Sequence, residues 1–97
     1  MYKITYHKLA LSKDLKRLSY ADATRIMRTI NKKLSTDPIA FGKPLWRELK
    51  NCYRLRIDPY RVVYKVEKEK VTVFIIQIGL RKDMLVYMEA AKRLGLV

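Results

Sequence analysis

Residues 52–66 read CYRLRIDPYRVVYKV and hold the clearest structural pattern in the chain. Within 53–57, apolar side chains alternate with two arginines, which is the period-two pattern of a β-strand with one buried face. The alternation returns in 60–66, after the short connection Asp58-Pro59. We therefore expect these two runs to pair as an antiparallel hairpin, although Asp-Pro is not one of the favoured two-residue hairpin turns.

Other strands are predicted on both sides of this hairpin. Residues 71–78 are apolar at nearly every position, as in a central strand that is covered on both faces. Residues 2–6 alternate and are rich in strand-forming residues, so they predict an opening strand. Residues 45–50 show a weaker alternation, which indicates one more strand after a loop at 36–44 that contains two prolines and a glycine.

Two short amphipathic helices in antiparallel contact are predicted between residues 8 and 35. Leucines at helical spacing mark the buried side of the first helix: Leu11, Leu15 and Leu18. The second helix is predicted to begin at Ser19, which has an acidic residue at capping-box spacing, and to end at Pro38. Its buried stripe is Ile26, Ile30 and Leu34. A terminal helix is expected from about residue 83.

These elements together define the α+β class. The predicted architecture has two N-terminal helices packed on a curved antiparallel sheet of four to five strands, followed by a C-terminal helix. The 97 residues contain no recognisable linker or internal repeat, so we expect residues 1–97 to form one domain.

Charge is the strongest compositional signal. Lys and Arg number 22 against 9 acidic residues, which gives a formal net charge of +13 and a pI near 10.1. Such a surface attracts polyanions whatever their sequence, so a nucleic acid or the ribosome is the expected partner. The alternative is a generic basic protein that binds an acidic partner.

Several functional classes are disfavoured by composition. The chain has one Cys, one His and three Gly, too few for an internal disulfide, a zinc cluster or a nucleotide-binding glycine loop. We expect no metal and no cofactor. No apolar run approaches the length of a membrane span, and the first residues lack a signal-peptide pattern, so we expect a cytoplasmic protein without a membrane partner.

Basic side chains gather on one face of the predicted hairpin. Strand alternation places Arg54 and Arg56 together, and Arg61 and Lys65 can join them across the hairpin. No acidic residue shares this face between 53 and 65, and arginine suits bidentate phosphate contact. A solvated cationic face without a function is the alternative, but like charges on adjacent strands destabilise a sheet, which favours a functional site.

The same residues resemble a known family. The run from Cys52 to Tyr64 is similar to the double strand of the RelE/ParE toxins of type II toxin–antitoxin systems, in particular the RelE-like mRNA interferases. Residues 76–81 (IQIGLR), followed by Val86-Tyr87, resemble the last strand, basic turn and C-terminal tyrosine of that family. The resemblance extends over almost the whole chain.

This resemblance implies a toxin that enters the ribosomal A site and cleaves messenger RNA without a metal, and that a cognate antitoxin neutralises. It implies catalytic roles for Arg61, Arg81 and Tyr87, and substrate and phosphate binding by Arg54, Arg56 and Lys65. The 2′-hydroxyl would attack the adjacent phosphorus, leaving a 2′,3′-cyclic phosphate or a 3′-phosphate and a 5′-hydroxyl.

Two departures from the family bear on the mechanism. Some relatives have lysines where this chain has Arg54 and Arg56, and an arginine cannot serve as a general base. The base is then Tyr87 or is unassigned. Leu80 stands where relatives often have a basic residue or histidine.

Two other functions stay open: a ParE-like inhibitor of DNA gyrase without nuclease chemistry, and an RNA-binding module that does not cleave. Arg61, Arg81 and Tyr87 together favour the nuclease.

Overall fold

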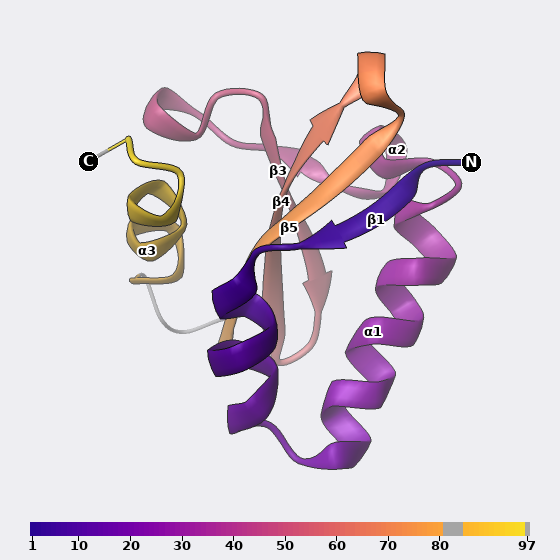
Figure 1. The fold of residues 1–97 in the computed structure, drawn as a ribbon, viewed down its shortest axis with the longest axis vertical. Helices are drawn as coiled ribbons and strands as arrows, with labels where there is room; N and C mark the ends of the chain where they lie inside the picture. The colour runs from indigo at the N-terminus through magenta and orange to yellow at the C-terminus, as the bar shows by residue number, and fades with distance from the viewer. Residues whose placement is uncertain (81–84, 97) are drawn as a thin grey trace.

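A five-stranded sheet forms the centre of the molecule. The computed structural model describes residues 1–80 and 85–96 (Figure 1). The strands lie in the order β1-β5-β4-β3-β2. Their bounds are β1 (Lys3–Tyr6), β2 (Lys43–Pro44), β3 (Cys52–Ile57), β4 (Tyr60–Glu67) and β5 (Thr72–Leu80). The α+β class expected from the sequence is confirmed.

The predicted hairpin is β3–β4. Its register pairs Tyr53 with Tyr64, Leu55 with Val62 and Ile57 with Tyr60, so the alternating apolar residues of both strands share one face. That face is buried because α1 packs against it. The β3–β4 pairing therefore confirms the period-two interpretation of residues 53–66.

β5 is the central strand and is covered on both faces, as its continuous apolar sequence predicts. It pairs antiparallel with β4 and parallel with β1. The expectation of a wholly antiparallel sheet is therefore wrong at this edge, and the sheet is mixed. The long connection allows this, because the chain between β1 and β5 includes α1 and three strands, and a long crossover can join parallel strands.

The predicted helical hairpin is only partly regular. α1 (Tyr20–Leu34) is a regular helix whose N-cap Ser19 accepts a hydrogen bond from the Asp22 backbone N–H at 3.1 Å, as expected. The first predicted helix consists instead of two irregular turns, η1 (Ala10–Asp14) and η2 (Leu15–Arg17). Because these turns depart from α-helical spacing, Leu11 is exposed rather than buried. Figure 1 shows the chain descending through these turns and returning through α1.

The segment between α1 and β3 differs most from expectation. α1 ends at Leu34, before Pro38, and Pro38 instead begins the one-turn helix α2 (Pro38–Phe41). The Tyr64 hydroxyl donates a hydrogen bond to the buried Pro38 carbonyl at 2.6 Å, which holds this turn against β4. The predicted loop at 36–44 therefore contains α2 and ends in β2.

The strand expected at 45–50 is absent from the described structure, which forms the short turn η3 (Arg47–Leu49) there. Leu45 and Leu49, whose spacing suggested a strand, both pack under the terminal helix α3 (Leu85–Arg93). Apolar residues four apart produce the same sequence signal in a turn of this kind as in a weak strand.

The helices lie in layers on the two faces of the sheet. Figure 1 shows α1 on one side and α3 on the other. One core lies beneath α1, and its fully buried members include Ile26, Ile30 and Tyr64. A second, smaller core lies beneath α3 and includes Val63 and Ile76. Among the described residues, no helix is long and apolar enough to cross a membrane.

His7 caps the start of η1. Its Nδ1 accepts the Leu9 backbone N–H at 3.0 Å, which requires the neutral imidazole. Desolvation lowers the pKa of His7, and the positive charges of Arg93 and Lys8 lower it further, against an opposite effect of Asp14. The His7 imidazole therefore binds a proton less readily in the folded chain than in the unfolded chain.

Lowering the pH through about 6.5 should therefore destabilise the protein, because the unfolded state binds the His7 proton first. In His7→Asn the side-chain oxygen can still accept the Leu9 N–H, but it does not titrate. Urea unfolding at about pH 7.5 and about pH 5.5 should show a larger loss for the wild type than for His7→Asn. Equal losses in the two proteins would show that His7 does not contribute.

Candidate active site

Four cationic side chains share one face of the β3–β4 hairpin. Arg56 lies directly opposite Arg61, and the pairs Arg54–Val63 and Cys52–Lys65 lie on the same face. The prediction that Arg54, Arg56, Arg61 and Lys65 share a face is therefore confirmed. We call these four residues the cationic face.

The cationic face has no acidic counterpart in the described structure. Across residues 1–80 and 85–96, none of its four side chains is within ion-pair distance of a carboxylate. Cβ atoms of directly opposed residues on antiparallel strands are about 5 Å apart, so Arg56 and Arg61 repel one another. Arg56 is exposed and Arg61 is half-buried. Two guanidinium groups arranged in this way form a strong site for an anion.

Lys43 extends this face beyond the residues that the sequence suggested. It is the first residue of β2, lies opposite Arg54 in the antiparallel ladder and is exposed. Sequence reasoning missed it because a strand of two residues is too short to show alternation.

α3 brings Tyr87 over the same side of the sheet. Gly79 lies opposite Arg61 on β5, and a Cβ at Gly79 would come within 2.8 Å of the Val86 side chain. Glycine therefore allows α3 to approach the sheet closely at this level. Tyr87, the next residue, is half-buried and packs against the core that contains Val63, the partner of Arg54. Arg81 lies outside the described residues, so the structure does not place it.

A buried ion pair holds the far end of α3. Arg93 Nη1 and Nη2 donate to Asp14 Oδ2 and Oδ1 at 2.7 and 2.9 Å, and the two side chains are only 5% and 2% exposed. Asp14 also accepts the Ile78 backbone N–H at 2.9 Å, and Arg93 donates to the Ile76 carbonyl at 2.9 Å. The pair therefore joins η1, β5 and α3.

Sequence reasoning missed this pair, although Asp14 carried a signal. Asp14 stands three residues after Leu11 and four before Leu18, which places a carboxylate within the apolar stripe of the predicted helix. A charge at such a position needs a buried partner. Its partner could not be named, because it lies 79 residues further along the chain.

A second link connects α3 with β5 near the centre of the sheet. Gln77 Nε2 donates to Glu89 Oε2 at 3.1 Å, and Gln77 lies opposite Val63. Together with the Arg93 contacts, this bond fixes α3 at two levels. Tyr87 lies two residues before Glu89, in the first turn of α3.

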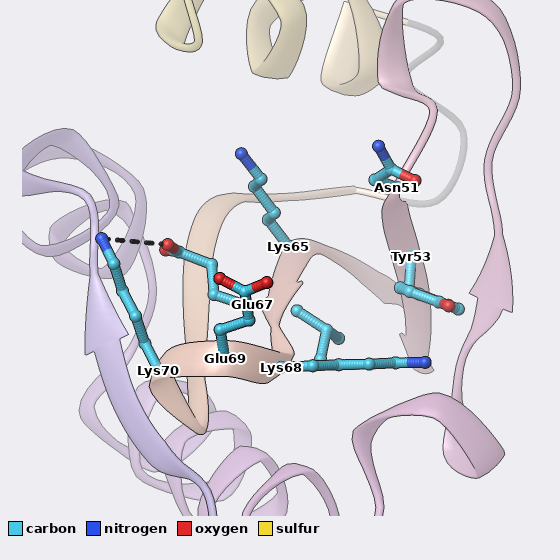
Figure 2. Close-up of a pocket in the computed structure, with 8 residues that line it drawn as sticks. Asn51, Tyr53, Lys65, Glu67, Lys68, Glu69 and Lys70 are labelled. Atoms are coloured by element: carbon cyan, nitrogen blue, oxygen red, sulfur yellow. Dashed lines mark ion pairs between the residues drawn. The ribbon is translucent and has the colours of Figure 1, made fainter.

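A hollow away from the cationic pair Arg56–Arg61 lies at the other end of β3 and β4. It has a volume of about 470 Å³ and is lined by Asn51, Tyr53, Lys65, Val66, Glu67, Lys68, Glu69 and Lys70. Figure 2 shows the Lys70–Glu67 ion pair (3.4 Å) and the Lys65 and Lys68 side chains pointing in different directions. Acids and bases are mixed here, and only Lys65 belongs to the cationic face. The convergent cations of β3 and β4 are therefore the stronger candidate for an RNA phosphate site.

The described residues contain no group of three or more His, Cys, Asp or Glu side chains arranged as metal ligands.

The chain belongs to the RelE/ParE superfamily of toxins, because residues 4–85 match the family described as ParE toxin of type II toxin-antitoxin system, parDE. It is 39% identical over 51 residues to toxin RelG of Mycobacterium tuberculosis. It is 48% identical over 50 residues to the mRNA interferase toxin RelE of Escherichia coli. These matches cover 53% and 50% of this chain, and only 59% and 53% of the two relatives.

Solved structures agree over a greater length. The toxin–antitoxin complex RelBE2 of Mycobacterium tuberculosis superposes with a TM-score of 0.77 at 30% identity, covering 82% of this chain and 98% of that one. A mutant Escherichia coli toxin RelE in the free state gives a TM-score of 0.75 at 30% identity, covering 95% and 96%. The family and the fold inferred from the sequence are both confirmed.

Arg93→Met should lower the free energy of unfolding by roughly 3–5 kcal/mol, because it leaves the Asp14 carboxylate buried without its countercharge. Adding Asp14→Asn should restore part of this loss, since a neutral amide can still accept the Ile78 N–H. Urea denaturation of the two variants and the wild type measures both steps. A loss below about 1 kcal/mol for Arg93→Met would contradict a stabilising role for the pair.

Proposed function

We propose that this chain, acting as a single toxin domain over residues 1–97, is an endoribonuclease that cleaves messenger RNA in the A site of the translating ribosome. The observation that carries the proposal is the directly opposed pair Arg56 and Arg61, which has no carboxylate partner in the described structure. The pair lies on the face of the sheet that α3, with Tyr87, packs against. The name of the Escherichia coli relative, an mRNA interferase, supports the same activity.

The proposed reaction is an internal transesterification. The 2′-oxygen of the RNA attacks the adjacent phosphorus, the bond from phosphorus to the 5′-oxygen breaks, and the products are a 2′,3′-cyclic phosphate and a 5′-hydroxyl. The phosphorane-like transition state carries more negative charge on its phosphoryl oxygens than the substrate does. Arg54, Arg56 and Arg61 stabilise that charge, and such preorganised electrostatic stabilisation is usually the largest catalytic contribution.

The two remaining residues, Tyr87 and Arg81, are proposed to act at the attacking 2′-hydroxyl and at the leaving 5′-oxygen. Tyr87 contacts the 2′-hydroxyl and is the candidate base. Arg81 is proposed to stabilise the negative charge on the leaving 5′-oxygen, by its match to the family motif, and that oxygen takes its proton from water. A weak base is sufficient if the ribosome holds the RNA in an attacking geometry, because positioning alone removes much of the barrier.

A cognate antitoxin and the ribosome are the proposed partners, and the cytoplasm is the proposed location. Several related structures are toxin–antitoxin complexes, including the intact Escherichia coli RelBE complex. The net charge of +13 suits an acidic antitoxin segment as well as ribosomal RNA.

Inhibition of DNA gyrase is the second candidate, because the matching family is named for the ParE toxin. It requires no nuclease chemistry on the cationic face. The two functions are separable by whether purified protein cuts messenger RNA on ribosomes or blocks supercoiling by gyrase.

Primer extension on a defined messenger RNA in a purified translation system tests the proposal. The wild type should produce breaks at A-site codons only when ribosomes are present. Arg61→Ala should slow cleavage roughly 100- to 1000-fold, because it removes one stabilising donor. Tyr87→Phe should slow it by roughly 100-fold, because it removes the group that accepts the proton.

Arg28→Ala is the matched control, because Arg28 is an exposed arginine of α1, on the other side of the sheet. It should cleave like the wild type. Intact messenger RNA with folded wild-type protein would refute the nuclease, and inhibited supercoiling in the same preparation would establish the gyrase alternative. Unchanged cleavage by Tyr87→Phe would remove Tyr87 from the mechanism.

A further inference from the structure

The only tryptophan of the chain stands on the surface. Trp46 is 79% exposed, although large aromatic side chains generally bury most of their area. An isolated exposed aromatic residue has no meaning by itself. Its position and its neighbours therefore decide whether it has a role.

Trp46 follows β2 by two residues and lies beside the start of β3, which carries Arg54 and Arg56. The preceding residue, Leu45, donates its backbone N–H to the Cys52 carbonyl at 3.0 Å and packs in the core beneath α3. Lys43, three residues before Trp46, lies opposite Arg54. Leu45 lies opposite Cys52, so Trp46 is level with Asn51, five residues before Arg56, and stands about 16 Å along the sheet from the Arg56–Arg61 pair. An RNA strand bound at that pair can reach this position with a nucleotide two or more positions from the bound phosphate.

Arg47 gives an independent indication. Its φ is +57°, in the left-handed region that side chains with a Cβ rarely adopt and that glycine enters freely. Arg47 is exposed and forms no ion pair with another described residue. Nothing within the described fold therefore requires an arginine there. Backbone strain of this kind concentrates at functional sites, where the side chain is needed for something other than folding.

We propose that Trp46 and Arg47 form a stacking site for an unpaired RNA base close to the cleaved phosphate. The indole ring stacks on the base, and the guanidinium of Arg47, with Lys43, contacts the adjoining phosphate. Aromatic stacking on splayed bases is the general way in which proteins hold single-stranded RNA. This inference rests on the proposed nuclease function and adds to it a residue that holds an unpaired base.

Trp46 fluorescence reports on this site directly, because no other tryptophan contributes. The protein to titrate is Tyr87→Phe, which holds RNA without cutting it, and the probe is a short single-stranded oligoribonucleotide at low salt. Fluorescence should be quenched saturably, and an oligonucleotide of the same length without bases should quench it much less. Trp46→Ala in the same background, measured by the anisotropy of a dye-labelled oligonucleotide, should raise the Kd about tenfold. Unchanged fluorescence, or equal quenching by the oligonucleotide without bases, would overturn the inference.

Two variants separate the site from folding. Tyr20→Ala is the matched control, because Tyr20 is an aromatic residue that is 88% exposed on α1, and its Kd should not change. Arg47→Gly should weaken RNA binding severalfold while its thermal midpoint stays equal or rises, because glycine adopts the left-handed backbone without strain. A lower midpoint with unchanged RNA affinity would assign Arg47 a structural role and would overturn its part in the inference.

The base can come from the messenger RNA or from ribosomal RNA, and cleavage on programmed ribosomes distinguishes them. If it belongs to the messenger RNA, Trp46→Ala should alter the relative cleavage of codons that have different flanking bases. If it belongs to the ribosome, all sites should weaken by the same factor. If Trp46→Ala cleaves with the rate and codon preference of the wild type, the inference is overturned and the proposed nuclease function still stands. Absence of cleavage by the wild-type protein would instead refute the proposed function. Quenching by an acidic peptide but not by RNA would show a protein-binding site.

Discussion

The buried pair Asp14–Arg93 is the interaction on which the placement of α3 depends. Both charges are removed from water, and they are compensated by a bidentate contact, by the Ile78 N–H and by the Ile76 carbonyl. Desolvation of two charges is costly, so this arrangement is stable only with complete hydrogen bonding. The ion pair therefore fixes the position of α3, because moving this helix away would leave a buried charge unpaired. The close approach that Gly79 permits then keeps Tyr87 on the side of the sheet that bears the arginines.

The cationic face shows the opposite electrostatic situation. Arg56 and Arg61 are opposed across two strands without a carboxylate near them in the described structure, so the free protein carries a repulsion that an anion removes. A protein selected only for stability would mix the two signs of charge on this face. A phosphate that gains negative charge during the reaction relieves the repulsion most in the transition state. In the proposed reaction, the same arrangement binds RNA and stabilises the transition state of its cleavage more strongly.

The sequence predicted those parts of the molecule that depend on short-range patterns. Alternation in 53–66 identified the hairpin and the shared face of Arg54, Arg56 and Arg61, and Ser19 identified the start of α1. Long-range features were not accessible in this way. The parallel β1–β5 pair and the Asp14–Arg93 contact join residues more than 60 positions apart, and no local periodicity reports such distances. The turn at Arg47–Leu49 was mistaken for a strand because two buried leucines produced the same pattern.

In the proposed mechanism, arginines and a tyrosine direct the 2′-hydroxyl of the RNA at its own phosphate. The chemical ends of the cut messenger RNA test this mechanism. Fragments from a purified translation system should carry a 2′,3′-cyclic phosphate or 3′-phosphate upstream of the break. The downstream fragment should carry a 5′-hydroxyl that polynucleotide kinase labels without prior phosphatase treatment. A 5′-phosphate paired with a 3′-hydroxyl would mean that water attacked the phosphorus, and would contradict the mechanism even if cleavage itself were observed.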